Sequence, residues 1–540
     1  MAIPASNLTV PLLRAPPFPG ADASVTRSAP ESAPILPAET EIDRVFAVIR
    51  EARIGGRFWA PPRDEHPSLI VRAASVAEAE ARLASLDEVD RAAALCLLPT
   101  DDVDPWSVLI PMGRLVAHGD DEWAAIAHIA GCSVSFLSTG RFGASESDIR
   151  GAVAREVFGW RYRDPFTGQD SDIGAAIALL AEWRRTLAAN RGIVAACGMA
   201  WWKRREIAQF LWAPGQPLRF FWSERRAIAY TTKTGGAIAA WPSRISVGMA
   251  EAANARGVRL VRIEDGFVRS VGLGSDLVPP SSVAVDRLGI HYDPAGPSDL
   301  EVLLAGADFP PALLARAERL RQVILAKGIS KYGGDEGHAF PLRQPGRTLV
   351  LVPGQVEDDM SVRLGGSGLA SNLELLRRAR VLEPDAEIWF RPHPDVDAGH
   401  RKGAVRDADA LAHADRVVRG GSMARLLDLV DAVHVLTSLT GFEALMRDRA
   451  VTCHGTPFYA GWSLTHDLAP VPARRGRALT VGELIAAVLI LYPRYLDPAT
   501  GLPCPPETLV RRMADGSAHN RLGWITRIRR AQGWMMRRRT

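Results

Sequence analysis

Residues 349–359 read Leu-Val-Leu-Val-Pro-Gly-Gln-Val-Glu-Asp-Asp, an apolar run that passes directly into a polar loop. Such a run is typical of a buried strand in a parallel sheet. Two further runs, Ala386–Arg391 and Ala432–Leu436, also end in polar loops, and helical patterns occur at Asn372–Ala379 and Thr440–Met446. The alternation predicts strand, loop and helix units, whose loops at the strand carboxyl ends form a ligand crevice.

A series of the same kind precedes this one in the chain. Its predicted strands are Ile193–Ala200, Leu218–Trp222 and Arg259–Ile263, with a predicted helix over Trp201–Leu211. The two series meet near Pro341–Gly346. We therefore expect an α/β fold of the GT-B type, with Rossmann-like lobes over residues 190–342 and 347–515 and the substrate in the crevice between them.

The region before residue 190 divides into two parts. Residues 1–40 are rich in Pro, Ala and Ser without periodicity, so we expect a flexible leader. Over residues 41–187, apolar runs alternate with helical stretches and predict a small α/β unit. The predicted strands are Ala92–Leu98, Trp106–Pro111 and Val134–Ser138, and the predicted helix is Glu122–Ala130.

One short turn sequence occurs twice. The copies are Tyr162-Arg-Asp-Pro-Phe-Thr-Gly168 and Tyr495-Leu-Asp-Pro-Ala-Thr-Gly501, which share five of seven residues. Asp-Pro and Thr-Gly are common turn formers, so a turn of this kind can recur by chance. Five identities favour an internal repeat, and we interpret residues 41–187 as the degenerate remnant of an earlier module.

The overall composition is that of a soluble globular enzyme, with 47% hydrophobic and 23% charged residues in a chain of 540. Five scattered cysteines form no C-x-x-C pair or metal-ligand spacing, which argues against a zinc site and a disulfide framework. We recognise no signal peptide and no apolar segment long enough to span a membrane. These features predict a cytoplasmic protein.

The net charge of +4 is concentrated at the C-terminus. Residues 516–540 form a predicted basic amphipathic tail, in which seven arginines follow Asn520 with no acidic residue among them. The pattern is typical of an interfacial helix on an anionic membrane, and equally of a terminal helix that packs on the body with solvated arginines. The rest of the chain is slightly acidic and carries no nucleic-acid motif, so we expect no nucleic-acid partner.

Three strand ends carry side chains suited to chemistry. In Glu264-Asp265-Gly266 we expect one carboxylate to face the crevice, where it can take a proton from a hydroxyl, and the other to support the loop. Asp359 suits a nucleophile or a metal ligand better than a phosphate cradle. His393 is bracketed by prolines that aim its ring, and a protonated histidine can neutralise a departing phosphate. Each motif also has a plain structural reading, as a solvated turn or a packed histidine.

Two downstream segments add candidate binding groups. Thr437-Ser-Leu-Thr-Gly-Phe-Glu443 opens a helix whose free amides suit a phosphate, although Ser438 or Thr440 can serve simply as its N-cap. His454-Gly-Thr-Pro-Phe-Tyr-Ala-Gly-Trp462 is an aromatic and glycine loop that suits a sugar or base, or plain packing.

Taken together, these motifs resemble the KpsC-type capsule polysaccharide biosynthesis family of bacterial β-Kdo transferases. The matching stretches are Glu264–Ser275, Asp276–Pro280, the Gly-Gln-Val-Glu-Asp-Asp run, Arg391–Pro394, Leu436–Leu445 and His454–Trp462. Their order and number make the resemblance specific over about residues 193–504.

The resemblance implies retaining transfer of Kdo from CMP-β-Kdo to a Kdo-extended lipid that roots a capsule chain. Asp359 would be the nucleophile, and Asp265, or secondarily Glu264, would activate the acceptor. His393 would hold the CMP phosphate. The further implied residues are Pro394, Ser438, Thr440, Gly441 and Gln355 for the nucleotide, and Arg269, Ser270, Arg391 and Tyr459 for the substrate. We expect no cofactor and no obligatory metal.

The resemblance also sets the expected partners and the alternatives. The partners would be CMP-Kdo, the lipid-linked Kdo acceptor and other capsule biosynthesis or export proteins, with the chain peripheral at the inner membrane. No Glu-Asp-Gly or Arg-Pro-His-Pro motif precedes residue 190, so a single linkage is expected. The competing hypotheses are a non-catalytic export or assembly factor and another nucleotide-sugar enzyme, such as a UDP-sugar epimerase.

Overall fold

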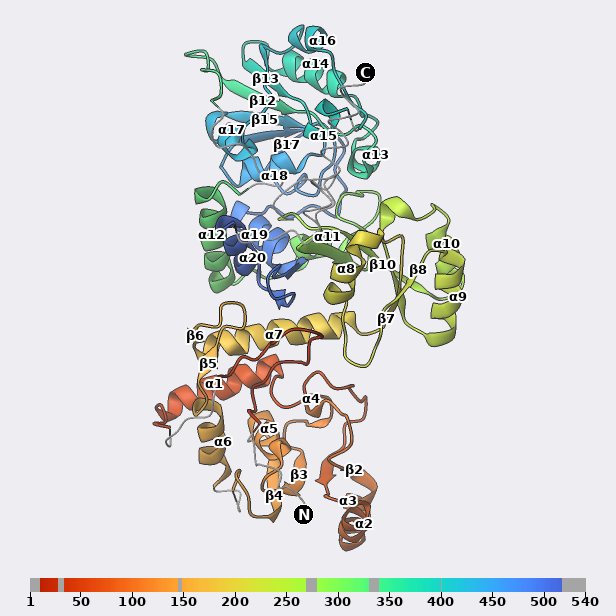
Figure 1. Ribbon diagram of the computed structural model, residues 1–540, viewed down its shortest axis with the longest axis vertical. Coiled ribbons are helices and arrows are strands. Elements are labelled where there is room, and N and C mark those ends of the chain that lie inside the picture. The colour runs from red at the N-terminus through yellow and green to blue at the C-terminus, as the bar shows by residue number, and fades with distance from the viewer. Residues whose placement is uncertain are drawn as a thin grey trace. The chain divides into compact units, whose positions relative to one another are not determined.

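The computed structural model describes residues 10–27, 34–143, 148–268, 279–329, 339–399 and 401–516 (Figure 1). The chain divides into two compact units. The first comprises Met1–Arg191 with Trp212–Pro217, and the second comprises Gly192–Leu211 with Leu218–Thr540. Each unit is described by itself.

The first lobe of the second unit is built on a seven-stranded sheet of order β19-β18-β11-β10-β9-β7-β8. Its first five strands in the chain are β7 (Ile193–Cys197), β8 (Arg219–Phe221), β9 (Ala237–Ala240), β10 (Arg259–Asp265) and β11 (Ser282–Asp286). The first four are parallel, and β11 runs antiparallel to β10. Because β10 ends at Asp265, the Glu264-Asp265 pair lies at the end of a strand, as predicted.

Helices cover both faces of this sheet. They are η1 (Trp201–Lys203), α8 (Arg204–Phe210), α9 (Glu224–Thr234), η2 (Pro242–Arg244) and α10 (Met249–Asn254). Ala239 packs with Phe210 of α8 on one face, whereas its neighbour Ile238 packs with Met249 of α10 on the other. Small apolar side chains on alternating faces thus allow the helices to approach a central parallel strand closely.

The second lobe is built on a six-stranded parallel sheet of order β14-β13-β12-β15-β16-β17. Its strands are β12 (Leu349–Pro353), β13 (Glu387–Arg391), β14 (Arg416–Val417), β15 (Ala432–Val435), β16 (Ala450–Cys453) and β17 (His466–Asp467). All five residues of β12 and all five of β13 are buried, which explains the apolar run of β12 and the Ile-Trp-Phe centre of β13. The strands predicted from residues 349, 386 and 432 onward are confirmed.

Helices cover both faces of this sheet, and each face has its own packed core. They are α13 (Met360–Gly365), α14 (Asn372–Leu382), α15 (Pro394–Asp397), α16 (Asp407–Leu411), α17 (Met423–Leu429) and α18 (Leu439–Leu445). Val350 packs with Leu376 of α14 on one face of the sheet, and Leu351 packs with Leu427 and Phe442 on the other. The latter core also contains Phe267 of the first lobe, so the two lobes share apolar packing.

The last described segment, residues 493–516, returns to the first lobe, which corrects the predicted boundary at residue 515. After α19 (Val481–Ile485) and the π-helix η4 (Ala486–Leu491), strand β18 (Pro493–Leu496) pairs antiparallel with β11. Strand β19 (Pro503–Cys504) pairs with β18, and α20 (Pro506–Ala514) follows. Together with α11 (Asp299–Gly306) and α12 (Pro311–Ala326), these elements complete the first lobe of a GT-B-like fold.

The first unit contains a four-stranded parallel sheet of order β2-β1-β3-β4. Its strands are β1 (Leu69–Arg72), β2 (Ala94–Leu97), β3 (Arg114–His118) and β4 (Ser133–Ser138), and a separate hairpin consists of β5 (Tyr162–Arg163) and β6 (Asp170–Ser171). The helices are α1 (Glu39–Ala52), α2 (Val76–Ser85), α3 (Glu88–Ala93), α4 (Pro105–Val108), α5 (Glu122–Ala130), α6 (Ile149–Phe158) and α7 (Ile173–Asn190).

Two predictions for this unit are wrong. The leader is not free over residues 10–27, because Leu12, Leu13 and Val25 are at most 1% exposed. Apolar residues spaced among prolines thus pack without any helical or strand periodicity. The segment predicted as a strand from Trp106 onward begins with helix α4, because Asp104 accepts a hydrogen bond from the Trp106 amide as N-cap and a proline occupies the first turn.

The repeated turn has the same structure in both copies. Tyr162 donates its hydroxyl hydrogen bond to the Val157 carbonyl, and Tyr495 donates to that of Leu489, at 2.6 and 2.7 Å. Gly168 and Gly501 close the turns at φ values of 71° and 74°. In each copy the turn joins two antiparallel strands, and a helix follows.

The parallel sheets of the first unit and of the second lobe also share a connection order. If the two-residue edge strand β14 is set aside, the orders β2-β1-β3-β4 and β13-β12-β15-β16 correspond, because in each the first strand lies between the second and the third and the fourth pairs with the third. The loop after the second strand reads Leu98-Pro-Thr100 in the first unit and Arg391-Pro-His393 in the second lobe. This correspondence extends the similarity from one turn to a whole sheet and its following hairpin.

Candidate functional site

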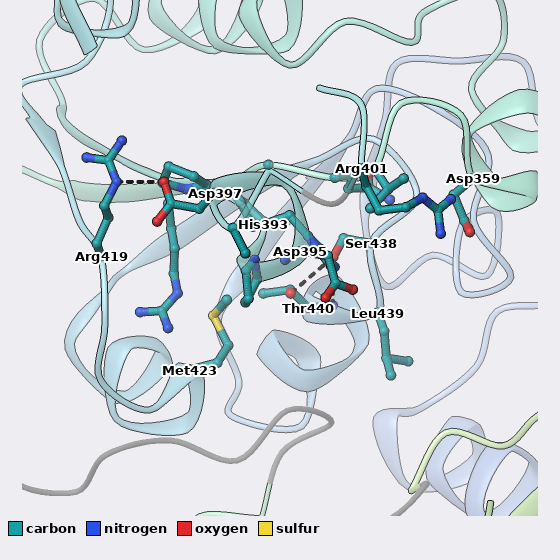
Figure 2. A pocket seen from close by; sticks show the side chains of 18 of the residues that line it. Asp359, His393, Asp395, Asp397, Arg401, Arg419, Met423, Ser438, Leu439 and Thr440 are labelled. Carbon is teal, nitrogen blue, oxygen red and sulfur yellow. Dashed lines mark hydrogen bonds and ion pairs between the residues drawn. The ribbon is translucent and has the colours of Figure 1, made fainter. Parts of the chain in front are cut away.

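A cavity of about 660 Å³ lies at the carboxyl edge of the second lobe's sheet (Figure 2). The loops that follow β12, β13 and β15 line it, together with the segment around Gly420. Its size is in the range of sites for small ligands and cofactors. In Figure 2, His393, Asp395 and Thr440 lie near the middle of the view, whereas Asp359 and Arg401 lie together at one end.

Gln355 joins two of these loops. Its side-chain oxygen accepts a hydrogen bond of 2.8 Å from the Thr437 amide, and its nitrogen lies 3.1 Å from the Thr437 hydroxyl. The Gln355 amide in turn donates to the side chain of Asn372 at 2.8 Å. These paired contacts set the distance between the loops after β12 and β15. Gln355 therefore lines the cavity and also stabilises its wall.

His393 is the N-cap of the short helix α15. Its Nδ1 accepts a hydrogen bond of 3.1 Å from the Asp395 amide. In neutral histidine a nitrogen that accepts is unprotonated, so this contact assigns the proton to Nε2. The ring lines the cavity, where an Nε2–H group can donate to an anionic oxygen.

Ser438 is the N-cap of α18, with its hydroxyl 3.2 Å from the Thr440 amide. The Tyr459 hydroxyl donates to the Ser438 carbonyl from behind the cavity. A Cβ on Gly441 would lie 2.2 Å from that hydroxyl, so only glycine fits there. Because Tyr459 is 0% exposed, it supports the site and does not reach the substrate, contrary to the prediction.

Arg391 also stabilises the turn at Gly420 and Gly421. Its guanidinium donates to the carbonyls of Gly420 and Gly421 at 2.7 and 2.8 Å, and burial lowers its pKa. The side chain lines the cavity while ordering this glycine turn. Arg269 and Ser270, which were predicted to bind substrate, lie outside the described residues, as does the basic tail beyond residue 516.

Asp359 is the exposed N-cap of α13 at the rim of the cavity. Its carboxylate accepts hydrogen bonds from the amide and the hydroxyl of Ser361, at 3.3 and 2.7 Å. Arg401, which also lines the cavity, forms an ion pair of 3.2 Å with the adjacent Asp358. The Asp359 carboxylate is thus held in one orientation and remains accessible.

The side chains of Glu264 and Asp265 lie in different environments. Asp265 forms an ion pair of 2.9 Å with Lys203. Glu264 accepts a hydrogen bond of 3.1 Å from the Asp265 amide, and its second oxygen lies 3.5 Å from the Tyr292 hydroxyl. Burial, then Asp265 and more weakly Asp359, raise the pKa of Glu264 to about 7 against the opposing effect of Lys203. The Asp359 carboxylate of the second lobe therefore lies within electrostatic reach of Glu264 in the first.

No pattern in the sequence pointed to Lys203 or Tyr292. Lys203 directly follows a tryptophan pair and occupies a one-turn helix, and its partner Asp265 is 62 positions away. Burial chiefly, and then Glu264 and Asp359, raise the pKa of Tyr292, so the phenol stays protonated near neutral pH. Within the described ranges, no group of three or more His, Cys, Asp or Glu residues is arranged to hold a metal ion.

Comparisons with known proteins agree on one family. A family model described as capsule polysaccharide biosynthesis protein matches residues 236–495. The chain is 39% identical over 348 residues to the capsule polysaccharide modification protein LipA of Neisseria meningitidis, covering 64% of this chain and 49% of LipA. It is 44% identical over 263 residues to the lipopolysaccharide-processing protein LpsZ of Rhizobium meliloti, covering 48% of this chain and 59% of LpsZ. The chain spans about half the length of the curated relatives it matches.

Two solved structures are similar over nearly their whole length. They are the β-Kdo 2,7 and β-Kdo 2,4 transferases of Thermosulfurimonas dismutans KpsC, both 32% identical to this chain. The TM-scores are 0.50 and 0.51, and the matches cover 60% and 59% of this chain and 99% and 98% of the solved chains.

Proposed function

The chain belongs to the KpsC-type capsule polysaccharide biosynthesis family, and we propose that it is a glycosyltransferase that moves Kdo from CMP-β-Kdo to a Kdo-bearing lipid with retention of configuration. One observation carries the proposal. An accessible carboxylate, Asp359, stands at the rim of a ligand-sized cavity and within electrostatic reach of the carboxylate pair that ends β10. Retaining sugar transfer through two displacements needs a nucleophilic carboxylate and a second proton-exchanging group.

The cavity provides groups for the nucleotide part of the donor. His393 directs its Nε2–H toward an anionic oxygen, and the Ser438 and Thr440 hydroxyls lie on the opposite loop. Gln355, in the loop after β12, is bonded to Thr437 in the loop that carries Ser438 and Thr440, so the position of this loop is fixed without a ligand. We assign no metal to this site, because a CMP-sugar already carries a good leaving group.

The reaction proceeds in two displacements. In the first, the Asp359 carboxylate forms a bond to C2 of Kdo while the bond from C2 to the phosphate oxygen breaks, and CMP leaves with the electron pair near His393. In the second, the acceptor oxygen bonds to C2, the bond between C2 and Asp359 breaks, and the hydroxyl proton passes to the Glu264-Asp265 pair. Two inversions restore the original configuration.

An assay of the full chain tests this function directly. Purified protein is incubated with CMP-Kdo, generated in situ, and a Kdo-lipid mimic, and the product linkage is determined by NMR. We expect one β-Kdo linkage and a mass increase of one Kdo on the peptide containing Asp359. Absence of both product and adduct would exclude the transferase and favour an export or assembly factor. Stabilisation by UDP-sugars in place of CMP would favour an epimerase.

The first unit explains why we expect a single donor site. Its sheet has the connection order of the second lobe, but Thr100 stands where the second lobe has His393. The equivalent of α18 is α5, whose N-cap is Asp121 and which begins with Glu122, so carboxylates replace Ser438. Asp121 and Glu122 are paired with Arg72 and Arg14, so carboxylates already occupy the helix N-terminus where a phosphate would bind, which supports a degenerate module without donor chemistry.

We further propose that the C-terminal tail binds the inner membrane at its anionic surface. Within the described ranges, no helix is long and apolar enough to cross a membrane. The arginines after Asn520 would instead attract acidic lipids, at roughly 1 kcal/mol for each residue near the surface. Deletion of residues 520–540 is expected to reduce cosedimentation with phosphatidylglycerol vesicles while activity on a soluble acceptor is kept. Unchanged sedimentation would show that these arginines are simply solvated.

A further inference from the structure

Lys203 places a buried positive charge behind the proposed acceptor-activating residues. It is the last residue of the short helix η1, which follows β7 and its loop, and it is only 7% exposed. Its ammonium lies 2.9 Å from a carboxylate oxygen of Asp265 and 3.6 Å from the ring centroid of Trp241, with Trp202 at 5.1 Å. A buried ammonium is costly unless it is paired, and here one carboxylate and two aromatic faces compensate it.

This pairing limits what Asp265 can do. A proton added to Asp265 would neutralise the carboxylate that lies 2.9 Å from a buried ammonium, so Asp265 is a poor acceptor for the proton of a hydroxyl. The same ion pair fixes the position of the Asp265 side chain, whose exposure is 21%. The Asp265 amide also donates to Glu264, so anchoring Asp265 fixes the direction of its neighbour.

Glu264 faces different partners. Adjacent side chains on a strand point to opposite faces, and β10 includes both residues. Glu264 contacts the Tyr292 hydroxyl and is influenced by Asp359, the proposed nucleophile, whereas Asp265 contacts Lys203. The two carboxylates thus have different neighbours, and the Glu264 side chain, which lies beside Tyr292, is partly exposed to solvent.

We propose that Lys203 is a positioning residue that anchors Asp265 and thereby leaves Glu264 as the group that takes the acceptor proton. In the second displacement the hydroxyl proton passes to the Glu264 carboxylate as the oxygen bonds to C2 of Kdo and Asp359 is released. The inference rests on the proposed transferase function and reverses the roles that the resemblance implied for the two carboxylates.

The pH dependence of transfer tests this role. Among the described residues, the charged and titratable groups that act on Glu264 include Asp265, Lys203, Asp359 and Tyr292. Glu264 must be deprotonated to accept a proton, so the rate rises with pH through its pKa. The Lys203 charge favours the carboxylate form, and its removal in Lys203→Met should move the rising limb of kcat upward by roughly one pH unit. Lys203→Arg keeps the charge and should retain the wild-type profile.

The controls separate this inference from the proposed function. Lys233→Met removes an exposed lysine of α9 in the same lobe, and its profile should match that of the wild type. Lys203→Met should still form the Asp359 adduct from CMP-Kdo, since the first displacement needs no acceptor proton. If Lys203→Met does not fold, Lys203→Gln replaces it with the same expected shift. A wild-type enzyme that transfers Kdo, with an unshifted profile in the variant, would overturn the inference alone.

Discussion

Replacement of Asp359 by Asn should reduce Kdo transfer by on the order of 10⁴-fold or more, because an amide oxygen is a weak nucleophile and the first displacement cannot occur. The fold should survive. Asp359 caps α13 through Ser361, and Asn is as good an N-cap as Asp. The variant therefore isolates the chemistry of one exposed carboxylate from its structural contribution.

Mass spectrometry and product formation provide the two measurements. The wild type incubated with CMP-Kdo alone should carry one Kdo on the peptide containing Asp359, and Asp359→Asn should carry none. Asp409→Asn is the matched control, since Asp409 is another surface aspartate of the second lobe and is bonded to Arg406 outside the cavity. Transfer by Asp359→Asn at a rate near that of the wild type would show that Asp359 is not the nucleophile.

The elements around the cavity were predictable because their patterns are local. Strands β12 and β13 are completely buried, so an apolar run marks each of them, five residues long in β12 and three residues long between Glu387 and Arg391 in β13. The polar loops that follow them lie at one edge because parallel strands all end on the same side of the sheet. His393 lines the cavity because it follows one of these strands. The prolines on both sides of it also predicted that the backbone would hold its ring in one direction.

Other features depend on contacts between distant parts of the chain. Strand β18 pairs with β11 across more than 200 residues, and no local pattern indicates which lobe a final hairpin joins. Tyr459 lies in a glycine and aromatic loop that suggested sugar binding, yet burial behind Ser438 gives it a supporting role. Leu12 and Leu13 pack in a proline-rich segment whose composition indicated disorder.

The division of roles between Glu264 and Asp265 shows this limit most clearly. The sequence predicted that one carboxylate would face the crevice and that the other would support the loop, and in the structure Asp265 pairs with Lys203 whereas Glu264 lies beside Tyr292. Strand alternation could not predict which of the two carboxylates would be ion-paired, because the partner is Lys203, a lysine 62 residues earlier in the chain. One long-range ion pair thus sets the chemistry of a short local motif.

Replacement of Glu264 by Gln should reduce product formation by roughly 10²- to 10⁴-fold, the usual contribution of a general base. Gln keeps an oxygen to accept the Asp265 amide, so the local hydrogen bonding is preserved. It cannot take a proton from the acceptor hydroxyl. Because the first displacement is unaffected, the Kdo adduct on Asp359 should accumulate in the presence of acceptor, whereas the wild type turns it over.

Asp265→Asn is the matched comparison for this prediction. Asn still offers Lys203 a hydrogen-bond acceptor, so we expect a smaller loss of transfer than in Glu264→Gln and no accumulation of adduct. The pKa of about 7 for Glu264 adds a second measurement, since the rise of the wild-type rate near neutral pH should vanish in Glu264→Gln. A trapped adduct in Asp265→Asn with normal turnover in Glu264→Gln would return the proton-accepting role to Asp265 and make Lys203 part of a different mechanism.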